Sequence, residues 1–363
     1  MKKFLIMVVI LILVLMGCNE PEPIIIGFSA GLSGEKAALG NSLRNSFMLK
    51  VDEINQQGGI NGRLIEVIVR DDENNLDQVK AVDEYFIKEG VTLIFGHDYS
   101  YKADTILETT KGKNIIVFSS TMSTNTIAGL DDNFFRTAPT ASLQGAAIGE
   151  YVSNKNKGLI IYDQDQIALV EGIIDGYSGV VGKSYDTWKG SSPFTDSIGE
   201  IGQLVINNNY DHIVYIASPE DTMMISSYLD VENYDGIQLS ASWALNTTDD
   251  DNINYPDGLL FVADDDLTTQ AYQEYLKAYE AKYNEKPGNA AINAYEGAII
   301  LFEGLKQAER LDYDGIKSSL LALDYVETAT GRTKFDPYGD ALKVMYYYII
   351  KDGKIIKYEK GDE

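Results

Sequence analysis

Residues 51–63 read VDEINQQGGINGR, and this stretch decides the fold because it ends a helix and returns the chain to a strand. Apolar residues leading into it recur at spacings of four, four and three, which predicts one apolar face of a helix. They are Leu43, Phe47, Val51 and Ile54. The helix is predicted to end at Gln57-Gly58-Gly59, since glycine takes the positive φ of a helix end. Apolar runs at 24–28 and 64–69 on either side complete a βαβ unit.

The rest of the chain repeats this alternation of short apolar runs and amphipathic stretches. Continuous apolar runs fit strands that are covered by helices on both faces of a parallel sheet. The further predicted strands are residues 92–95, 115–118, 159–162, 212–216, 237–240 and 259–262, followed by helices at 272–283 and 290–308. Asp352-Gly353 predicts the turn of a hairpin over residues 343–358. The predicted fold class is therefore α/β, with mainly parallel sheets flanked by helices.

Two lobes are expected from length alone. The chain has 363 residues, whereas single cores stop growing at about 250 to 300 residues. Composition breaks at residues 137–140 and 263–269 are candidate connections between the lobes.

The N-terminus has the pattern of a bacterial lipoprotein signal. Lys2 and Lys3 precede an apolar run at residues 4–16, and small Gly17 stands before Cys18, the only cysteine in the chain. The alternative is an uncleaved membrane helix, but a helix needs about 20 apolar residues to cross a bilayer, and this run is much shorter.

Cleavage would remove residues 1–17, leave 18–23 as a tether and attach lipid at Cys18. The protein would then be extracytoplasmic and lipid-anchored to the bacterial membrane, at the cell surface or in the periplasm. No thiol would remain for a disulfide, so the core alone would stabilise the fold.

The charge excludes one class of partner. The chain has 30 Lys and Arg against 55 Asp and Glu, a net charge of −25, and loss of Lys2 and Lys3 makes it −25 − 2 = −27. Nucleic-acid binding draws on lysines and arginines that meet phosphates, so no nucleic-acid partner is expected. Hydrophobic residues make up 45% of the chain, as in ordinary globular proteins.

Motifs of one family stand in order along almost the whole chain after the signal. They are Leu32-Ser33-Gly34 with Gly40, residues 51–63, Arg70-Asp71-Asp72, Ile94-Phe95-Gly96 with Ser100, Phe135-Arg136-Thr137 with Pro139, Tyr295 with Ala298, and Gly331 with Phe335-Asp336 and Gly339-Asp340. On these residues the chain resembles the substrate-binding lipoproteins of branched-chain amino acid ABC transporters. This is the leucine-binding type, with the type I periplasmic-binding-protein fold.

The resemblance implies two lobes joined by three crossing strands, with a small ligand in the cleft between them. The crossings are placed near Pro139, Ala263 and Gly331. Lobe one then takes 24–139 and 264–330, and lobe two takes 140–263 and 331–363. Ligands of open α/β sheets bind at the carboxyl ends of the strands. The corresponding loops are 34–40, 97–101 and 119–123 in lobe one, and 163–168, 217–221 and 241–246 in lobe two.

The resemblance also implies a carboxylate site. Ser100 matches a serine that binds the ligand carboxylate, and Ser120 and Thr121 lie in the second carboxylate-binding loop. The alternatives are that Ser100 only caps a helix and that 119–123 is a hydroxyl-rich loop.

Departures from the family pattern bear on the ligand. Trp243 stands in place of the acid that meets an amino acid's ammonium, Met122 replaces a threonine, and Ile167 replaces a tyrosine. A one-residue shift would move the threonine match to Thr121. Burying an ammonium without a counter-charge is costly, so a ligand without one is favoured.

An apolar or aromatic ligand body would meet a wall of Trp243, Tyr99 and Leu39. Ordinary packing is the alternative for Trp243, and a structural role is favoured for Tyr295. The full set of predicted ligand-binding residues is Leu39, Tyr99, Ser100, Ser120, Thr121, Met122, Ile167, Ser218, Trp243 and Tyr295.

Enzymatic chemistry is not expected. His97 and His212 each end or begin an apolar run without a partner motif, and no HExxH or paired CxxC spacing occurs. Gly182-Lys183-Ser184 lacks the first glycine of a phosphate loop, and the acidic runs 249–251 and 264–266 lack calcium-loop spacing. We therefore expect no catalytic residue, metal or cofactor.

The sequence predicts a monomeric receptor that captures an amino acid-like molecule, small carboxylate or amide and delivers it to an ABC permease. The alternative is a sensory receptor of the same fold that reports to a signalling partner.

Overall fold

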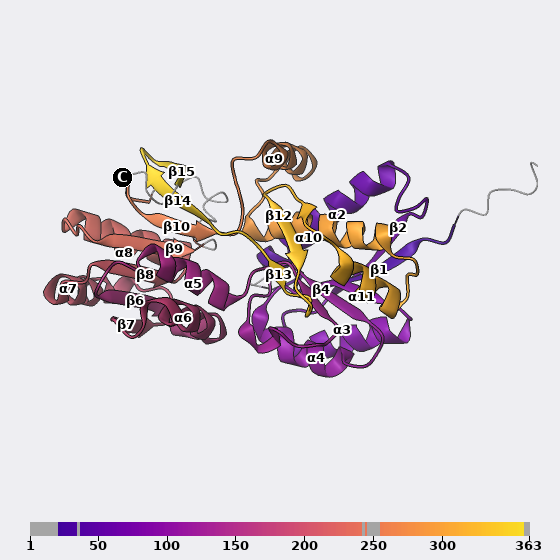
Figure 1. The fold of residues 1–363 in the computed structure, drawn as a ribbon, viewed down its shortest axis with the longest axis horizontal. Coiled ribbons are helices and arrows are strands. Elements are labelled where there is room, and N and C mark those ends of the chain that lie inside the picture. The colour runs from indigo at the N-terminus through magenta and orange to yellow at the C-terminus, as the bar shows by residue number, and fades with distance from the viewer. Residues whose placement is uncertain (1–20, 35–36, 242–243, 245–254, 359–363) are drawn as a thin grey trace, which may run out of the picture.

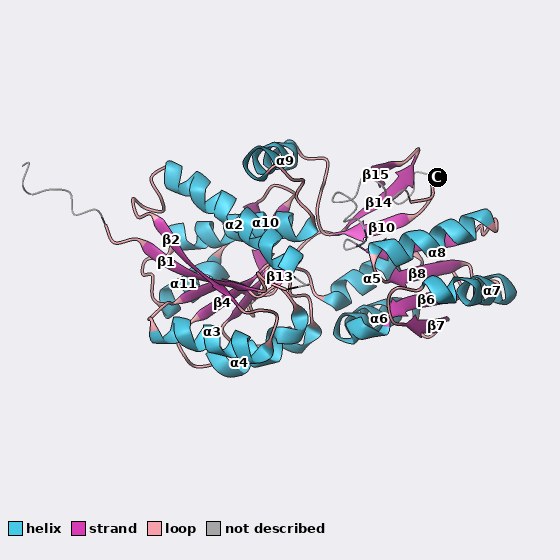
Figure 2. Ribbon diagram, turned by 180° about the vertical axis from the view of Figure 1, so that it is seen from behind, coloured by secondary structure: helices cyan, strands magenta, loops and turns pink. Residues whose placement is uncertain are grey.

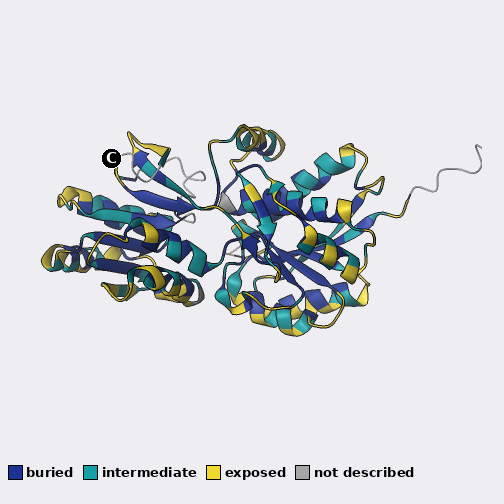
Figure 3. Ribbon diagram, viewed as in Figure 1, coloured by how far each residue is buried: buried dark blue, intermediate teal, exposed yellow. Residues whose placement is uncertain are grey.

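Two mainly parallel sheets, each covered by helices, lie side by side in the computed structural model (Figures 1 and 2). The structure describes residues 21–34, 37–241, 244 and 255–358. Across these residues, no helix combines the length and apolarity needed to cross a membrane. The central strands of both sheets are buried, and exposed residues gather on the outer helix faces and loops (Figure 3). The predicted α/β class is confirmed.

The first sheet has five parallel strands in the order β2-β1-β3-β4-β5. They are β1 (Ile24–Ala30), β2 (Ile65–Asp71), β3 (Leu93–Gly96), β4 (Ile116–Ser119) and β5 (Phe134–Arg136). One face is covered by α2 (Ala37–Gln56), α10 (Asn289–Gln307) and α11 (Tyr313–Ala322), and the other by α3 (Leu76–Lys88) and α4 (Ala103–Thr110). α9 (Gln270–Tyr283) packs against α2 and α10 through a tyrosine-rich cluster.

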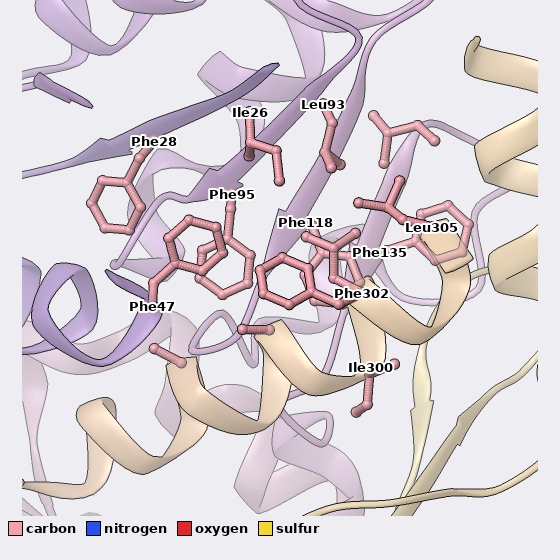
Figure 4. Packing of buried hydrophobic residues seen from close by; sticks show 14 of the residues in the cluster. Ile26, Phe28, Phe47, Leu93, Phe95, Phe118, Phe135, Ile300, Phe302 and Leu305 are labelled. Atoms are coloured by element: carbon pink, nitrogen blue, oxygen red, sulfur yellow. The ribbon is translucent and has the colours of Figure 1, made fainter. Parts of the chain in front are cut away.

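Phenylalanine rings form the centre of this first lobe (Figure 4). The ring of Phe47, on the helix predicted from its apolar spacing, stacks on Phe95 with centroids 4.1 Å apart. Phe28 and Phe118 stack on the same Phe95 ring from neighbouring strands. Full burial of such a ring stabilises the fold by about 1.5–3 kcal/mol. Aromatic packing of Phe47 therefore helps to hold the helix on the sheet, together with the aliphatic Leu43 and Val51.

The second sheet has seven strands in the order β15-β14-β10-β9-β8-β6-β7. They are β6 (Gly158–Asp163), β7 (Tyr185–Gly190), β8 (His212–Ile216), β9 (Ile237–Ala241), β10 (Leu260–Ala263), β14 (Tyr346–Lys351) and β15 (Lys354–Tyr358). α5 (Ala141–Tyr151) and α6 (Ile167–Val181) cover one face, and α7 (Ile198–Asn208) and α8 (Pro219–Val231) cover the other. The predicted hairpin is present, with its turn at Asp352-Gly353.

The third connection between the sheets lies later in the chain than the sequence predicts. A small antiparallel sheet is formed by β11 (Val326–Glu327), β12 (Arg332–Phe335) and β13 (Ala341–Leu342). The ring of Phe335 packs edge-on against Phe118 and Phe135 in the core of the first lobe. The chain therefore leaves the first lobe only after Leu342, and the predicted crossing near Gly331 is wrong because β12 is anchored in that core.

Ion pairs hold the three connections, which are irregular segments at residues 137–140, 264–269 and 343–345. Nε of Arg136, just before the first, lies 2.6 Å from Oδ1 of Asp340, shortly before the third. Nζ of Lys343, in the third, lies 2.6 Å from Oδ2 of Asp264, in the second. The connections are thus tied to one another by buried charges.

Candidate ligand-binding site

A pocket of about 390 Å³ lies between the two lobes. This volume falls within the range of about 300–1,000 Å³ that is usual for small-molecule sites. Its first-lobe lining is Leu39, Asp98, Tyr99, Ser100, Tyr101, Thr121, Ser123, Ala290 and Asn293. Its second-lobe lining is Gln144, Asp165, Gln166, Ile167 and Leu169, and the connections add Ala138, Pro139 and Asp264. Most of these residues follow the carboxyl ends of parallel strands, as the fold predicts.

The loop after β3 is aimed into the pocket by two left-handed residues. Gly96 has a φ of 124°, and a Cβ there would lie 2.2 Å from the carbonyl oxygen of Ser29, so only glycine fits. His97 follows with a φ of 56°. The turn brings residues 98–101 to the pocket.

Asp98 is fixed by a buried cluster of charges at the base of this loop. Nζ of Lys102 lies 2.5 Å from Asp98 Oδ1, and 2.6 and 2.8 Å from the two carboxylate oxygens of Asp72. The backbone N–H of Gly31 donates to Asp98 Oδ2 at 3.2 Å. Burial raises the pKa of Asp98, against the opposing effect of the Lys102 ammonium. The cluster orients the Asp98 carboxylate before any ligand binds.

Hydroxyl groups stand beside Asp98. The Ser100 hydroxyl accepts from the backbone N–H of Ser123 at 3.3 Å, which leaves its own proton available to a ligand. Ser100 also opens a helical segment, η1 (Ser100–Lys102) continuing into α4, whose first N–H groups lack partners within the helix. Thr121 donates its hydroxyl to the carbonyl oxygen of Asp98 at 2.8 Å. A hydroxyl and a helix N-terminus together suit a carboxylate.

Two tyrosines add aromatic surface to this half of the pocket. The rings of Tyr99 and Tyr101 stack with centroids 5.7 Å apart. Burial and the Asp98 carboxylate raise the pKa of Tyr101 to about 12. Both phenols are therefore neutral at ordinary pH, since burial also raises the pKa of Tyr99.

The second lobe contributes a more open surface. Asp165 and Gln166 lie in the turn η3 (Gln164–Gln166), where the Asp163 carboxylate accepts from the backbone N–H of Asp165 at 3.0 Å. Ile167 begins α6 and is 47% exposed. This edge faces the first lobe, because α6 contacts η1 and η2 (Asn125–Ile127) of that lobe.

Asp264 belongs to a second buried charge cluster at the connections. Lys343 lies 2.6 Å from Asp264, 3.6 Å from Asp265 and 3.4 Å from Glu296. Burial alone would lower the pKa of Lys343, but these three carboxylates hold it above its ordinary value. Burial and the neighbouring Asp264 raise the pKa of Asp265 well above its ordinary value. Thr330 donates to Asp265 at 2.7 Å, which ties the cluster to the small sheet.

The pocket brings together half of the residues predicted from sequence: Leu39, Tyr99, Ser100, Thr121 and Ile167. Trp243 and most of loop 241–246 lie outside the described residues. No residue of loop 217–221 is among the described residues that line the pocket.

Four other predicted residues lie elsewhere. Ser120 is buried beneath the loop, and Met122 packs in the core on the α3–α4 face. Ser218 caps α8 by accepting from the backbone N–H of Asp221 at 3.1 Å. The ring of Tyr295 packs at a tilt against Tyr275, and its hydroxyl donates to Glu53 at 2.7 Å. The side chains of Met122, Ser218 and Tyr295 are thus held by packing, capping or hydrogen bonding away from the pocket.

The acidic character of the pocket was not predicted from the sequence. No carboxylate was expected to meet a ligand ammonium, whereas Asp98, Asp165 and Asp264 all line the pocket. Asp98 and Asp165 fall inside loops that were predicted, so a polar residue directly after an apolar strand was the available signal. Gln144, Ala290 and Asn293 lie near the N-terminal ends of helices that only the tertiary fold directs at the pocket.

The two histidines have structural partners. Nε2 of His97 lies 3.1 Å from Oδ1 of Asp83, and both side chains are fully buried. His212 lies between Asp211, 2.8 Å from Nδ1, and the Tyr177 hydroxyl, 2.5 Å from Nε2. Within the described ranges, no group of three His, Cys, Asp or Glu residues is placed to hold a metal ion.

Two α/β lobes with a pocket between them define a two-lobed binding protein. The chain belongs to the periplasmic binding protein family, whose model matches residues 23–354. The family is one of binding proteins, not of enzymes. The predicted resemblance is thereby confirmed.

Relatives of known name share most of their length with the chain. A Leu/Ile/Val-binding protein of Rhizobium johnstonii is 23% identical over 352 residues, covering 93% of this chain and 94% of the relative. A leucine-, isoleucine-, valine-, threonine- and alanine-binding protein of Pseudomonas aeruginosa is 20% identical, covering 88% and 87%.

Solved structures show the same fold. A branched-chain amino acid transporter substrate-binding protein of Streptococcus pneumoniae, in complex with isoleucine, has a TM-score of 0.74 at 22% identity, covering 93% of this chain and 100% of that one. A solute-binding protein of R. palustris, in complex with benzoate, has a TM-score of 0.75 at 18% identity, covering 92% and 95%.

Proposed function

We propose that the chain is the extracytoplasmic receptor of an ABC importer, which captures a small organic solute between its lobes and delivers it to a permease. The observation that carries the proposal is the pocket of about 390 Å³ lined by both lobes and by two of the three connections. A solute that touches both lobes favours the state in which they are close together.

The Ser100 hydroxyl and the adjoining helix N-terminus are the proposed binding point for a ligand carboxylate. Relatives of the same fold are described with a branched-chain amino acid and with an aromatic acid, and both ligands carry that group. The predicted roles of Leu39, Tyr99, Thr121 and Ile167 in ligand contact belong to the same proposal. The protein would act as a monomer.

Lipid attachment at Cys18 is the second part of the proposal. A diacylglyceryl group on Cys18 would hold the protein beside its permease, and a tether at residues 18–23 would leave both lobes free to move. Growth of expressing cells with labelled palmitate should mark the parent protein and leave the Cys18→Ala variant unlabelled. Equal labelling of both would contradict attachment at this residue.

Calorimetric titration tests solute capture. The purified protein should bind at least one of leucine, isoleucine, lysine and benzoate, and its melting temperature should rise, since a ligand at a hundredfold excess over its Kd adds about 2.7 kcal/mol to stability. If the protein bound none of these four compounds, and none of a broader set of amino acids and aromatic acids, the proposal would be overturned.

A further inference from the structure

We propose that the pocket selects a ligand of net positive charge, such as a basic α-amino acid, which is attracted by the exposed carboxylate of Asp165 and by the negative charge of the buried Asp98 and Asp264 clusters behind the pocket wall. The inference rests on the proposed function, because it names the ligand class of the same pocket. It departs from the branched-chain and aromatic ligands with which relatives are described.

The first observation is the sign of the charges around the pocket. Three carboxylates line it, and no Lys, Arg or His is among the described lining residues. The segment 242–254 contains no Lys, Arg or His at all, and residues 35–36 contribute one charge of each sign.

The second observation is that Lys102 does not neutralise its cluster. One ammonium lies between two carboxylates, 2.5 Å from Asp98 and 2.6 Å from Asp72, and all three side chains are fully buried. One positive and two negative charges leave one unit of negative charge at the pocket. Both Asp98 oxygens are bonded within the protein, to Lys102 and to Gly31. Because the side chain is fully buried, its charge acts on a ligand electrostatically through the pocket wall and not through a direct hydrogen bond.

The cluster around Lys343 has the same imbalance. Asp264, Asp265 and Glu296 share this one ammonium. Even without Asp265, whose pKa is raised by burial, Asp264 and Glu296 outnumber this one ammonium and leave one unit of negative charge. Asp264 presents this charge at the pocket wall.

Asp165 supplies the third negative charge from the opposite lobe. It is exposed, and no ion pair to its carboxylate is found among the described residues. Its backbone N–H is bonded to Asp163, which fixes the turn that carries it. Closure of the lobes would move this charge toward Asp98, at a free-energy cost unless a cation lies between them.

Charge balance then separates the ligand classes. A neutral amino acid brings one positive and one negative charge, so the closed pocket would keep all three negative units. A basic amino acid brings one more positive charge, and its carboxylate still meets Ser100. The stacked Tyr99 and Tyr101 rings offer a surface that also favours a cation over a neutral side chain.

The test is calorimetric titration of the purified protein with L-lysine, L-leucine and benzoate. We expect L-lysine to bind at least tenfold more tightly than L-leucine at low salt, and benzoate to bind most weakly. The advantage of lysine should shrink at about 1 M NaCl, where the Debye length is only about 3 Å.

An Asp165→Asn variant locates the charge, because Asp165 is exposed and its replacement leaves the buried clusters intact. Lysine affinity should fall about tenfold and leucine affinity should change less than about twofold. Asp175→Asn is the matched control. It removes the same charge from an exposed position on α6 that does not line the pocket, and lysine affinity should not change.

The outcomes separate this inference from the proposed function. Leucine or benzoate binding more tightly than lysine would overturn the cationic ligand and leave solute capture standing. Lysine binding that Asp165→Asn does not weaken would overturn the role of Asp165. Absence of binding by lysine and by every neutral or anionic probe would overturn both the inference and the proposed function.

Discussion

The two sides of the pocket are built differently. On the first lobe, Asp98 is 3% exposed and its carboxylate is already bonded to Lys102 and Gly31. On the second lobe, Ile167 is 47% exposed and the neighbouring Asp165 has an open carboxylate. We infer from this difference that the first-lobe side is already organised, while the second-lobe side would gain its contacts when the lobes approach. We expect a ligand to bind the first lobe, after which the second lobe closes on it.

Removal of Lys102 should give the largest effect. Lys102→Met leaves Asp72 and Asp98 buried without their counter-charge, which should cost about 3–5 kcal/mol of unfolding free energy. Urea denaturation of the ligand-free protein measures it. The control, Lys306→Met, breaks an exposed pair with Glu303 and should cost less than about 1 kcal/mol. Equal losses in the two variants would show that the first-lobe side is not held by this cluster.

Loss of the Ser100 hydroxyl should act on binding instead of stability. Hydrogen bonds to charged groups contribute about 1.5–3 kcal/mol, so Ser100→Ala should weaken the affinity for an amino acid at least tenfold. The melting temperature of the ligand-free protein should hardly change. Ser153→Ala, which removes an exposed hydroxyl outside the pocket, is the control for the titration. If Ser100→Ala bound the amino acid as tightly as the parent does, the ligand carboxylate would not be bound at Ser100.

The pH dependence of the free energy of unfolding should reveal the raised pKa of the buried Asp98 carboxyl. Burial raises the pKa of Asp98 above its ordinary value of 3.8 in the folded state, so the folded state binds its proton more tightly than the unfolded state does. Its contribution to stability is therefore complete at low pH and decreases as pH rises from 3.8 through the raised pKa.

Comparison with Asp98→Asn isolates this contribution. The stability difference between parent and variant should change with pH in that window, whereas Asp175→Asn should follow the parent curve. Binding of a cationic ligand should show the opposite trend and strengthen as Asp98 ionises. Parallel parent and Asp98→Asn curves would contradict the assignment.

Truncation of the exposed side should have the smallest effect. Ile167→Ala should alter the free energy of unfolding by no more than about 0.5 kcal/mol, since the side chain is half exposed in the ligand-free protein. It should still weaken ligand affinity about three- to tenfold, because closure would bury the isoleucine. Val231→Ala, at a position 76% exposed at the end of α8, should change neither quantity. Strong destabilisation by Ile167→Ala would mean that the second-lobe side is also organised in advance.

Much of the fold could be predicted because its signals are local. Each predicted apolar run became a strand, and the helix inferred from Leu43, Phe47, Val51 and Ile54 is α2. Short or half-exposed strands were missed, among them β5 and β7, because their residues carry no continuous apolar run. The third connection was misplaced because Phe335 is held by a core that residues far away in the chain create.

The site was less predictable than the fold. Loops after buried strands located Tyr99, Ser100 and Ile167 at the pocket, since the carboxyl ends of parallel strands converge at one edge. Met122 and Ser120 share a loop with Thr121, yet they point into the core, and no local pattern distinguishes a buried side chain from its neighbour there.

The sequence by itself determined two α/β lobes of the periplasmic binding protein family, because apolar periodicity and turn residues act over a few neighbours in the chain. Only the tertiary structure decided the charge of the pocket. Asp98, Asp165 and Asp264 come from three distant segments, and the lysines beside Asp98 and Asp264 are each shared with further carboxylates that packing brings together. Electrostatic energy depends on distance in space and on burial, and neither quantity can be read from the order of residues.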